Sequence, residues 1–343
     1  MISTKLPETF KAFAERECKG SSKLYESISL KLAEDPYVLE LCSHAPLGQP
    51  VPNLLYGAVH YLLLKEKDHP LARFYASIDS KPQSPEAAFP HFKNFCAAHR
   101  EKIIELLQIK MVQTNEVRRC GYLFPTFNYI YTKTNKPLAL IEIGTSAGFQ
   151  LLWDHYSYSY NKGTIYGSRE SELVIQTEVI GKGKPLFPYS LPPVQARYGI
   201  DLHINDMRNE EDSLWMKALI WPEHQTRREL FEKAEQCMQQ NQGKITFIEG
   251  NGVDLLPAIA GGIPDEITIV VFHTHVANQM PYETKIKLLE TIKTIAAKRD
   301  IFHLYNNIRD SYLRLDSFVG DINDHKLVAE TDGHGRWFSW KLT

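Results

Sequence analysis

Apolar residues recur at helical spacing through the first third of the chain. Where apolar side chains lie three and four positions apart, an amphipathic helix is predicted. Five segments show this spacing: Thr9–Cys18, Lys23–Ala33, Leu54–Lys65, Pro90–Leu107 and Arg119–Tyr131. Prolines separate most of them, and no long β run occurs before residue 137. We therefore predict a helical domain over residues 1–135, which contributes the substrate side of a cleft.

The pattern changes after residue 136, where short aliphatic runs alternate with helical stretches. Pro137–Gly144 is a dense aliphatic run that ends in glycine, as strands buried on both faces often do. Similar runs at 196–205, 244–250, 266–274 and 300–306 predict further strands, and residues 326–341 predict a closing hairpin. Strands that alternate with helices form a parallel sheet. We predict an α/β fold with a Rossmann-like domain over residues 136–343.

Residues 156–195 interrupt this alternation. The segment is rich in Tyr, Ser, Thr and Val, and Gly163, Gly167 and Gly181 break it into short pieces. This composition is typical of β-hairpins and not of the helix that usually follows a first parallel strand. We therefore predict a β-rich insertion here.

The first predicted strand runs into a short acidic and glycine-rich loop. Its sequence from Glu142 to Gly148 is E-I-G-T-S-A-G, and a helix over Ala147–His155 is expected to follow. Glycine permits a tight turn, and free backbone N–H groups at a helix start favour a carboxylate or other anion. Glu142 is placed to orient the loop or to accept a hydrogen bond from a ligand amino group. We predict that Glu142, Gly144, Thr145, Ser146 and Gly148 bind a cofactor.

Three later features follow in the order that a bound nucleoside requires. Asp201 ends the second predicted strand, where an acid suits ribose hydroxyls. Asn251 and Gly252 follow the third strand, where adenine would lie. His273 and His275 end the fourth strand, are expected to share one face, and are candidate general bases because an imidazole titrates near neutral pH. Together these features indicate S-adenosylmethionine (SAM) as the cofactor.

Polar residues also precede the first strand. Asn115, Glu116 and Arg118 come shortly before the last helix of the predicted helical domain. A helix cap is one interpretation of them. The other is that they line the cofactor cleft from the helical side, and we carry them as candidate binding residues.

Several stretches resemble an uncharacterised bacterial family, domain of unknown function 2332, which is grouped with methyltransferase-like folds. They are 45–65, 114–120, 142–157, 199–202, 218–228 and 270–276. The resemblance spans nearly the whole chain. It implies a class I SAM-methyltransferase sheet and leaves the chemistry open.

Composition and net charge limit the classes of partner that we expect. The formal net charge is −2 with the basic residues spread along the chain, so no nucleic-acid partner is expected. Five widely spaced cysteines indicate reduced thiols, and the apolar runs are too short to span a bilayer. We expect a cytoplasmic, metal-free methyltransferase that acts on a small-molecule or protein acceptor.

Two alternatives stay open. Gly144-T-Ser146-A-Gly148 also fits G-x-S-x-G, the nucleophile elbow of serine hydrolases, with Asp201 or Asp254 as the acid. The histidine of such a triad would be one of those late in the chain: His303, His325 or His334. Alternatively, the domain binds SAM or another nucleotide without catalysis, because no methyl-acceptor motif is recognisable.

Overall fold

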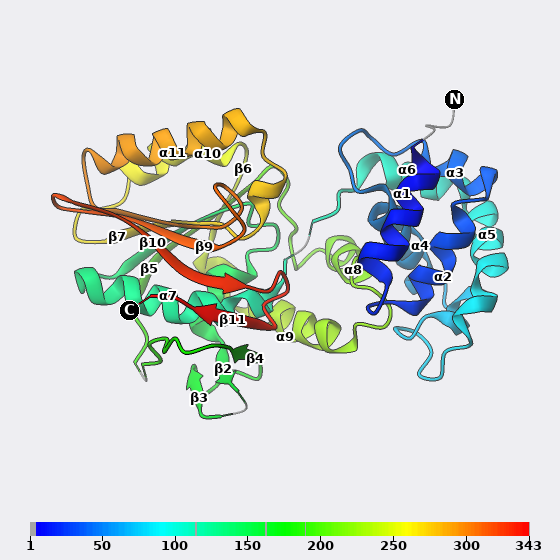
Figure 1. The fold of residues 1–343 in the computed structure, drawn as a ribbon, viewed down its shortest axis with the longest axis horizontal. Helices are drawn as coiled ribbons and strands as arrows, with labels where there is room; N and C mark the ends of the chain where they lie inside the picture. Colours follow the sequence, from blue (N-terminus) through cyan, green and yellow to red (C-terminus); the bar gives the residue numbers. More distant parts are fainter. Residues whose placement is uncertain (1–4, 114, 162, 189, 343) are drawn as a thin grey trace. The chain divides into compact units, whose positions relative to one another are not determined.

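The computed structural model describes residues 5–113, 115–161, 163–188 and 190–342 (Figure 1). It divides into two compact units: Met1–Thr114 with Asn209–Glu229, and Asn115–Arg208 with Leu230–Thr343. The chain therefore leaves the first unit, returns to it, and leaves again within helix α9 (Gln225–Asn241). Residues 115–135, which we had grouped with the helical domain, fall in the second unit.

The described part of the first unit is built from helices around one apolar core. Its main helices are α1 (Leu6–Phe13), continued by a π-helical turn (Ala14–Cys18), α2 (Lys23–Leu32), α3 (Pro36–Cys42), α4 (Val51–Lys65), α5 (Ala88–Ala98), α6 (Arg100–Ile109) and α8 (Glu210–Ala218). Short 3₁₀ turns lie at Pro70–Phe74 and Pro85–Ala87. Trp215 and Ala218 of α8 belong to the same buried core as the residues from the beginning of the chain.

Local signals explain where these helices start. Asp35 caps α3 by accepting hydrogen bonds from the N–H groups of Tyr37 and Val38, and Pro36 occupies the first helical position. The spacing of apolar residues did not predict this helix. The single helix predicted over 90–107 is two helices, because the chain breaks at His99 between α5 and α6.

The second unit contains a large, mostly parallel sheet, as predicted. The strand order is β3-β2-β4-β11-β10-β9-β8-β7-β1-β5-β6. The strands are β1 (Leu138–Ile143), β2 (Ser157–Tyr160), β3 (Ile165–Gly167), β4 (Val174–Val179), β5 (Val194–Asp201), β6 (Thr246–Glu249), β7 (Thr268–Phe272), β8 (Ile301–Tyr305), β9 (Leu313–Val319), β10 (Ile322–Thr331) and β11 (Trp337–Trp340). Strands β6, β5, β1, β7 and β8 are mutually parallel.

Helices cover both faces of this parallel region, which explains why its central strands β1, β7 and β8 are fully buried. Apolar residues of α10 (Gly252–Gly261) and α11 (Tyr282–Ala296) pack with β1, β7 and β8 into one core. On the other face, Phe127 of α7 (Cys120–Thr134) contacts Phe272, with ring centroids 5.3 Å apart. Figure 1 shows α10 and α11 on one side of the sheet and α7 on the other. All six residues of β1 are buried.

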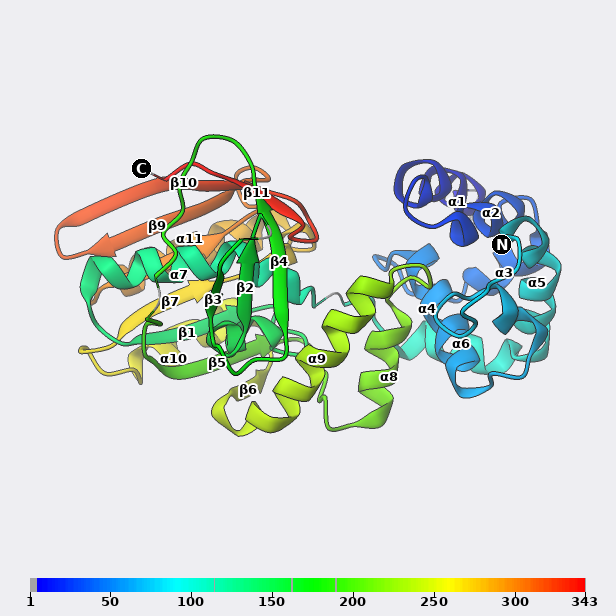
Figure 2. The same ribbon diagram turned by 90° about the horizontal axis from the view of Figure 1, so that it is seen from below.

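In the second unit, two elements differ from the prediction. The segment after β1, Phe149–His155, consists of 3₁₀ turns with a kink at Leu152 instead of an α-helix, and it leads directly into β2. Strand β9 lies antiparallel between β8 and β10, where we predicted no strand. The insertion does form β2, β3 and β4, which Figure 2 shows as one group. Among the described residues, no helix combines the length and apolar character needed to cross a membrane.

Candidate functional site

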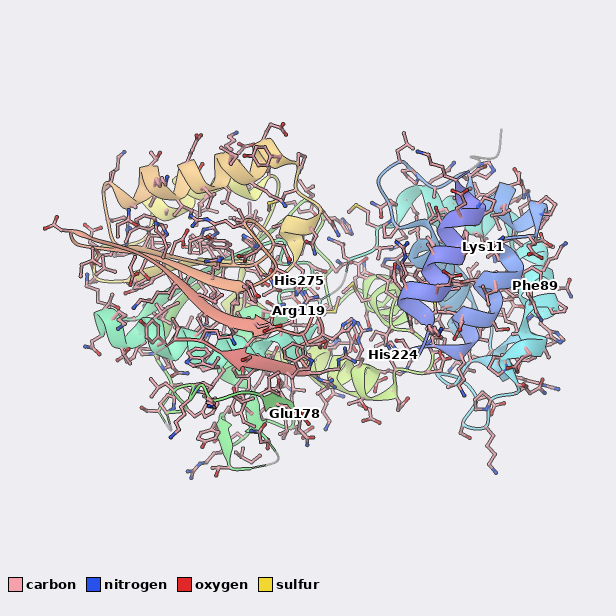
Figure 3. All side chains as sticks on the ribbon, viewed as in Figure 1. Lys11, Phe89, Arg119, Glu178, His224 and His275 are labelled. Carbon is pink, nitrogen blue, oxygen red and sulfur yellow. The ribbon has the colours of Figure 1, made fainter. Side chains whose placement is uncertain are left out.

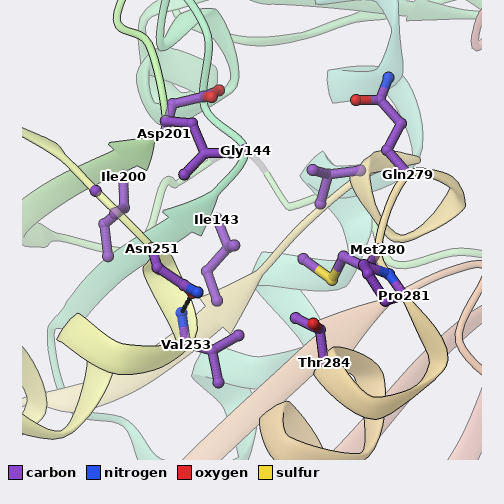
Figure 4. Close-up of a pocket in the computed structure, with 14 residues that line it drawn as sticks. Ile143, Gly144, Ile200, Asp201, Asn251, Val253, Gln279, Met280, Pro281 and Thr284 are labelled. Carbon is purple, nitrogen blue, oxygen red and sulfur yellow. Dashed lines mark hydrogen bonds between the residues drawn. The ribbon is translucent and has the colours of Figure 1, made fainter. Parts of the chain in front are cut away.

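A cavity of about 270 Å³ opens at the carboxyl ends of the central strands, within the second unit (Figure 4). Its walls come from the ends of β1, β5 and β6, the loop after β7, and the first turns of α10 and α11. The lining residues are Ile143, Gly144, Ile200, Asp201, Leu202, Gly250, Asn251, Gly252, Val253, Val276, Gln279, Met280, Pro281 and Thr284. Ligands of open α/β sheets bind at such an edge, where the strand order reverses.

Gly144 shapes the floor of this cavity. It has φ +76°, and a Cβ placed there would lie 2.5 Å from the side chain of Val276. Both facts exclude a side chain, because the left-handed region strains most residues and the loop after β7 approaches closely. The predicted glycine bend is present and lines the cavity.

The backbone of the bend is used internally, contrary to our expectation. The N–H groups of Gly144 and Thr145 donate to the Ile200 carbonyl at 2.8 and 3.2 Å, and that of Gly148 donates to Thr145. The Ser146 N–H donates to Asp201 Oδ2 at 2.7 Å. Three of these donors hold the bend against the end of β5 and the fourth closes the bend on itself, so the loop does not present these N–H groups to a ligand.

Two carboxyl groups lie behind the bend. Glu142 is buried and accepts a hydrogen bond from Thr145 Oγ1 at 2.7 Å. Burial, opposed by the hydrogen bond from Thr145 and assisted by nearby Asp201, raises the pKa of Glu142 to about 8. Burial also raises the pKa of Asp201, which backbone N–H donors oppose. At neutral pH, Glu142 is therefore protonated and uncharged. Of the two carboxyl groups, Asp201 is the one that lines the cavity.

Asn251 has a structural task beside its predicted one. It is the N-cap of α10, and its Oδ1 accepts the N–H of Val253 at 3.0 Å. The cap leaves the amide nitrogen of Asn251, which belongs to the cavity wall, to donate to a ligand. That amide nitrogen donates, so it suits a purine ring nitrogen, which accepts, better than an exocyclic amino group.

Ser146, the serine of the G-x-S-x-G pattern, has an unusual backbone conformation. Its φ is +51°, in the left-handed region, and its Oγ accepts a hydrogen bond from Asn205 Nδ2 at 3.1 Å. The candidate triad partners do not form a triad with Ser146 in the contacts that the structure describes: His303 is fully buried and has no hydrogen-bond partner on either ring nitrogen, and Asp201 accepts the backbone N–H of Ser146. His325 Nδ1 bonds to Asp316 at 2.7 Å, Asp254 pairs with Lys287, and His334 lies 3.6 Å from Glu116.

His273 and His275 do not share a face, because β7 ends at Phe272 and His275 takes a left-handed backbone with φ +65°. His273 is fully buried, with its ring centroid 5.5 Å from that of His303. Neither ring nitrogen of His273 has a hydrogen-bond partner in the described structure. Burial lowers the pKa of His273 to about 3, so this imidazole is neutral at physiological pH.

The polar residues before α7 contact the bend and its surroundings. Asn115 Nδ2 donates to the Thr145 carbonyl at 2.5 Å. Glu116 is buried and accepts from the backbone N–H of Arg118. Arg119, which we had not singled out, donates to Gly333 and Thr274. Asn115 therefore lies against the glycine bend within the second unit, but Asn115, Glu116 and Arg118 are not among the residues that line the cavity.

Comparison with known proteins identifies the family. Residues 7–340 match the model of a family described as uncharacterized protein conserved in bacteria (DUF2332). The chain belongs to this family. No curated protein and no solved structure matches this DUF2332 chain. The family description assigns no activity, so the chemistry has to be argued from the site.

Sequence reasoning found four of the residues that line the cavity of this DUF2332 protein: Gly144, Asp201, Asn251 and Gly252. It missed the wall formed by the connection from β7 to α11 and by the first turn of α11, where Val276, Gln279, Met280, Pro281 and Thr284 line the cavity. This connection carries no glycine motif. Its one signal was position, because it follows a strand end at the ligand-binding edge of a parallel sheet.

Proposed function

We propose that the second unit is a Rossmann-like, SAM-dependent methyltransferase domain whose cavity receives the nucleoside part of SAM. The observation that supports this proposal is that the cavity lies at the ligand-binding edge of a sheet with a nucleotide-binding strand order. In chain order, the five parallel strands β1, β5, β6, β7 and β8 take the spatial order 3-2-1-4-5. That is the order of the dinucleotide-binding fold, and the cavity lies at the edge where its ligands bind.

The lining chemistry supports a nucleoside. Asp201 offers carboxylate oxygens to vicinal ribose hydroxyls at the end of the strand beside β1. Val253 and Met280 supply apolar walls for a flat base, and the Asn251 amide supplies a donor. An apolar pocket with a few placed polar groups is the usual form of a small-molecule site. When bound, SAM would supply the transferable methyl group.

Calorimetry with the purified full chain tests the proposal. We expect SAM and S-adenosylhomocysteine to bind, and NAD and ATP to bind much more weakly. Asp201→Asn should weaken SAM binding at least tenfold, because a carboxylate that accepts from two hydroxyls becomes a mixed amide. Asp265→Asn, on an almost fully exposed side chain outside the cavity, is the matched control. Binding of NAD alone would overturn the proposal.

Turnover separates an enzyme from a binding protein. Release of S-adenosylhomocysteine in the presence of candidate acceptors would indicate catalysis, whereas tight binding without turnover across acceptor classes would favour the non-catalytic alternative.

One observation favours the hydrolase alternative, namely the positive φ of Ser146 at the centre of G-x-S-x-G. A fluorophosphonate probe decides it. Because Asn205 donates to Ser146 Oγ, His325 bonds to Asp316 and His303 is fully buried, we expect no labelling. Labelling of the wild type that disappears in Ser146→Ala would establish the hydrolase instead.

A further inference from the structure

A second polar site lies where β7 and β8 end, beside the bend but outside the cavity lining. It is centred on His275, whose backbone N–H donates to Asn306 Oδ1 at 2.7 Å. Asn307 Nδ2 lies 3.2 Å from His275 Nδ1. These contacts hold the histidine in a left-handed backbone conformation that costs free energy, of order 1–3 kcal/mol. Such strain is often kept where it positions a functional group.

The contacts of His275 determine which ring nitrogen carries the proton. A side-chain amide nitrogen only donates, so His275 Nδ1 accepts from Asn307 and the proton of the neutral ring is on Nε2. Burial, assisted by Arg119, lowers the pKa of His275 to about 3. At neutral pH the ring is therefore an uncharged N–H donor and is poorly suited to the general-base role that the sequence suggested.

Two buried donors at this place lack partners. Neither Nε2 of His275 nor Nδ2 of Asn306 has a hydrogen-bond partner among the residues that the structure describes. Asn306 is fully buried, and its Oδ1 is fixed by the His275 backbone. An unmade buried hydrogen bond costs about 1–3 kcal/mol. Two such donors, on residues that are joined by a hydrogen bond, indicate a site where the acceptor oxygen of a ligand would bind.

The surrounding charges indicate what kind of oxygen it is. Arg119 donates to both Thr274 oxygens, which places a guanidinium charge next to His275 (Figure 3). The acidic neighbours have other contacts: Glu116 lies against His334, and Asp332 pairs with Arg336 at 2.7 Å. One cation with two neutral donors suits a singly charged carboxylate better than a doubly charged phosphate.

We infer that His275 Nε2–H and Asn306 Nδ2, beside Arg119, bind a carboxylate group of the methyl-accepting substrate. That this ligand is the acceptor rests on the proposed function, whereas the carboxylate site itself does not. His275 thereby becomes a specificity-determining donor that selects acidic acceptors.

NMR of the histidine side chains in the full chain, without SAM, tests the site directly. We expect the spectrum to show the Nε2–H form of His275, and benzoate to shift its ring resonances in a saturable way. Methyl benzoate, which lacks the charge, should not. A short peptide with a free C-terminus, compared with its amidated form, distinguishes a protein carboxylate from a small acid.

Variants make the test specific. Asn306→Asp keeps the oxygen that accepts the His275 N–H but replaces the donor by an acceptor, so benzoate binding should fall at least tenfold. His275→Asn tolerates the left-handed backbone and removes the Nε2 donor, with the same expected loss. His325→Gln, outside the site, should bind like the wild type. Equal shifts with acid and ester, or unchanged binding in both site variants, would overturn the inference. Carboxylate binding without SAM binding would instead overturn only the proposed function.

Discussion

Gly144 shows how a single position sets the shape of the cavity. Its positive φ and the 2.5 Å approach of Val276 leave no room for a Cβ. We predict that Gly144→Ala lowers the free energy of unfolding by about 1–2 kcal/mol through backbone strain alone, with the contact to Val276 adding to it. SAM binding should weaken in parallel, because the loop has to move.

Urea unfolding measures this effect, with Gly261→Ala as the control. Gly261 is at the end of α10, and a Cβ there would meet no atom within 4 Å. We expect that variant to stay within about 0.5 kcal/mol of the wild type. Equal stability of the two variants would mean that the bend is not constrained as described.

Glu142 should make stability fall as the pH rises. Its pKa is about 8 in the folded chain against an ordinary value of 4.5, so only the folded state holds the proton between these values. Below pH 4.5 the stabilisation is fully present. It is lost as the pH rises through the window, by about 1.4 kcal/mol per unit, and is gone above pH 8.

Glu142→Gln isolates this contribution, because glutamine keeps an oxygen that accepts from Thr145 but does not titrate. The free energy of unfolding of the variant, measured in urea, should therefore increase relative to that of the wild type as the pH rises from 5 to 9. A difference that is constant over this range would show that Glu142 is ionised in the folded chain at pH 7. The buried histidines, whose pKa values are lowered, cancel in the comparison.

The sequence predicted the strand and the glycine of the bend, but not the hydrogen bonds that its backbone N–H groups make. The strand over 138–143 and the need for glycine at 144 follow from local patterns. The Ile200 carbonyl and the Asp201 carboxylate, which occupy the N–H groups of the bend, are more than fifty residues away in the chain. The burial that keeps Glu142 neutral likewise depends on packing that a local pattern does not contain.

At the scale of elements, α10 combines a structural start with a cavity wall. Asn251 caps the helix through Oδ1 and leaves its amide nitrogen at the cavity. We predict that Asn251→Asp keeps the cap, since aspartate is an equally good N-cap, but weakens SAM binding because the donor is lost. Asn251→Ala should lose both, with about 1 kcal/mol less stability.

Urea unfolding and calorimetry on the same three proteins check this separation. A loss of binding in Asn251→Ala with full binding in Asn251→Asp would assign Asn251 a capping role only.

The elements that sequence reasoning placed best are those with an uninterrupted apolar run, such as β1 and β7. Those it missed are short or polar. The segment after β1 has too few residues before β2 for an α-helix, and Gly148 with φ +77° sets its start. Strand β9 alternates buried with half-buried residues and includes buried Asp316, so it has no continuous apolar signal.

At the scale of the molecule, the first unit depends on a segment from the middle of the chain. Trp215 is almost fully buried, and its Nε1 donates to the Met111 carbonyl at 2.9 Å. Gly57 of α4 lies so close to α8 that a Cβ would meet Leu219 at 2.8 Å. Residues 209–229 therefore complete the core that residues 1–114 begin.

This arrangement predicts how the first unit can be isolated. A fragment of residues 1–114 alone should expose the site of Trp215 and fail to fold cooperatively. The same fragment joined through a flexible linker to residues 209–229 should show a cooperative thermal transition by circular dichroism. Trp215→Ala in the joined fragment should cost about 3–5 kcal/mol, because a large buried side chain is removed. Cooperative folding of 1–114 by itself would contradict the shared core, since helices of this length gain most of their stability from packing and not from their own propensity.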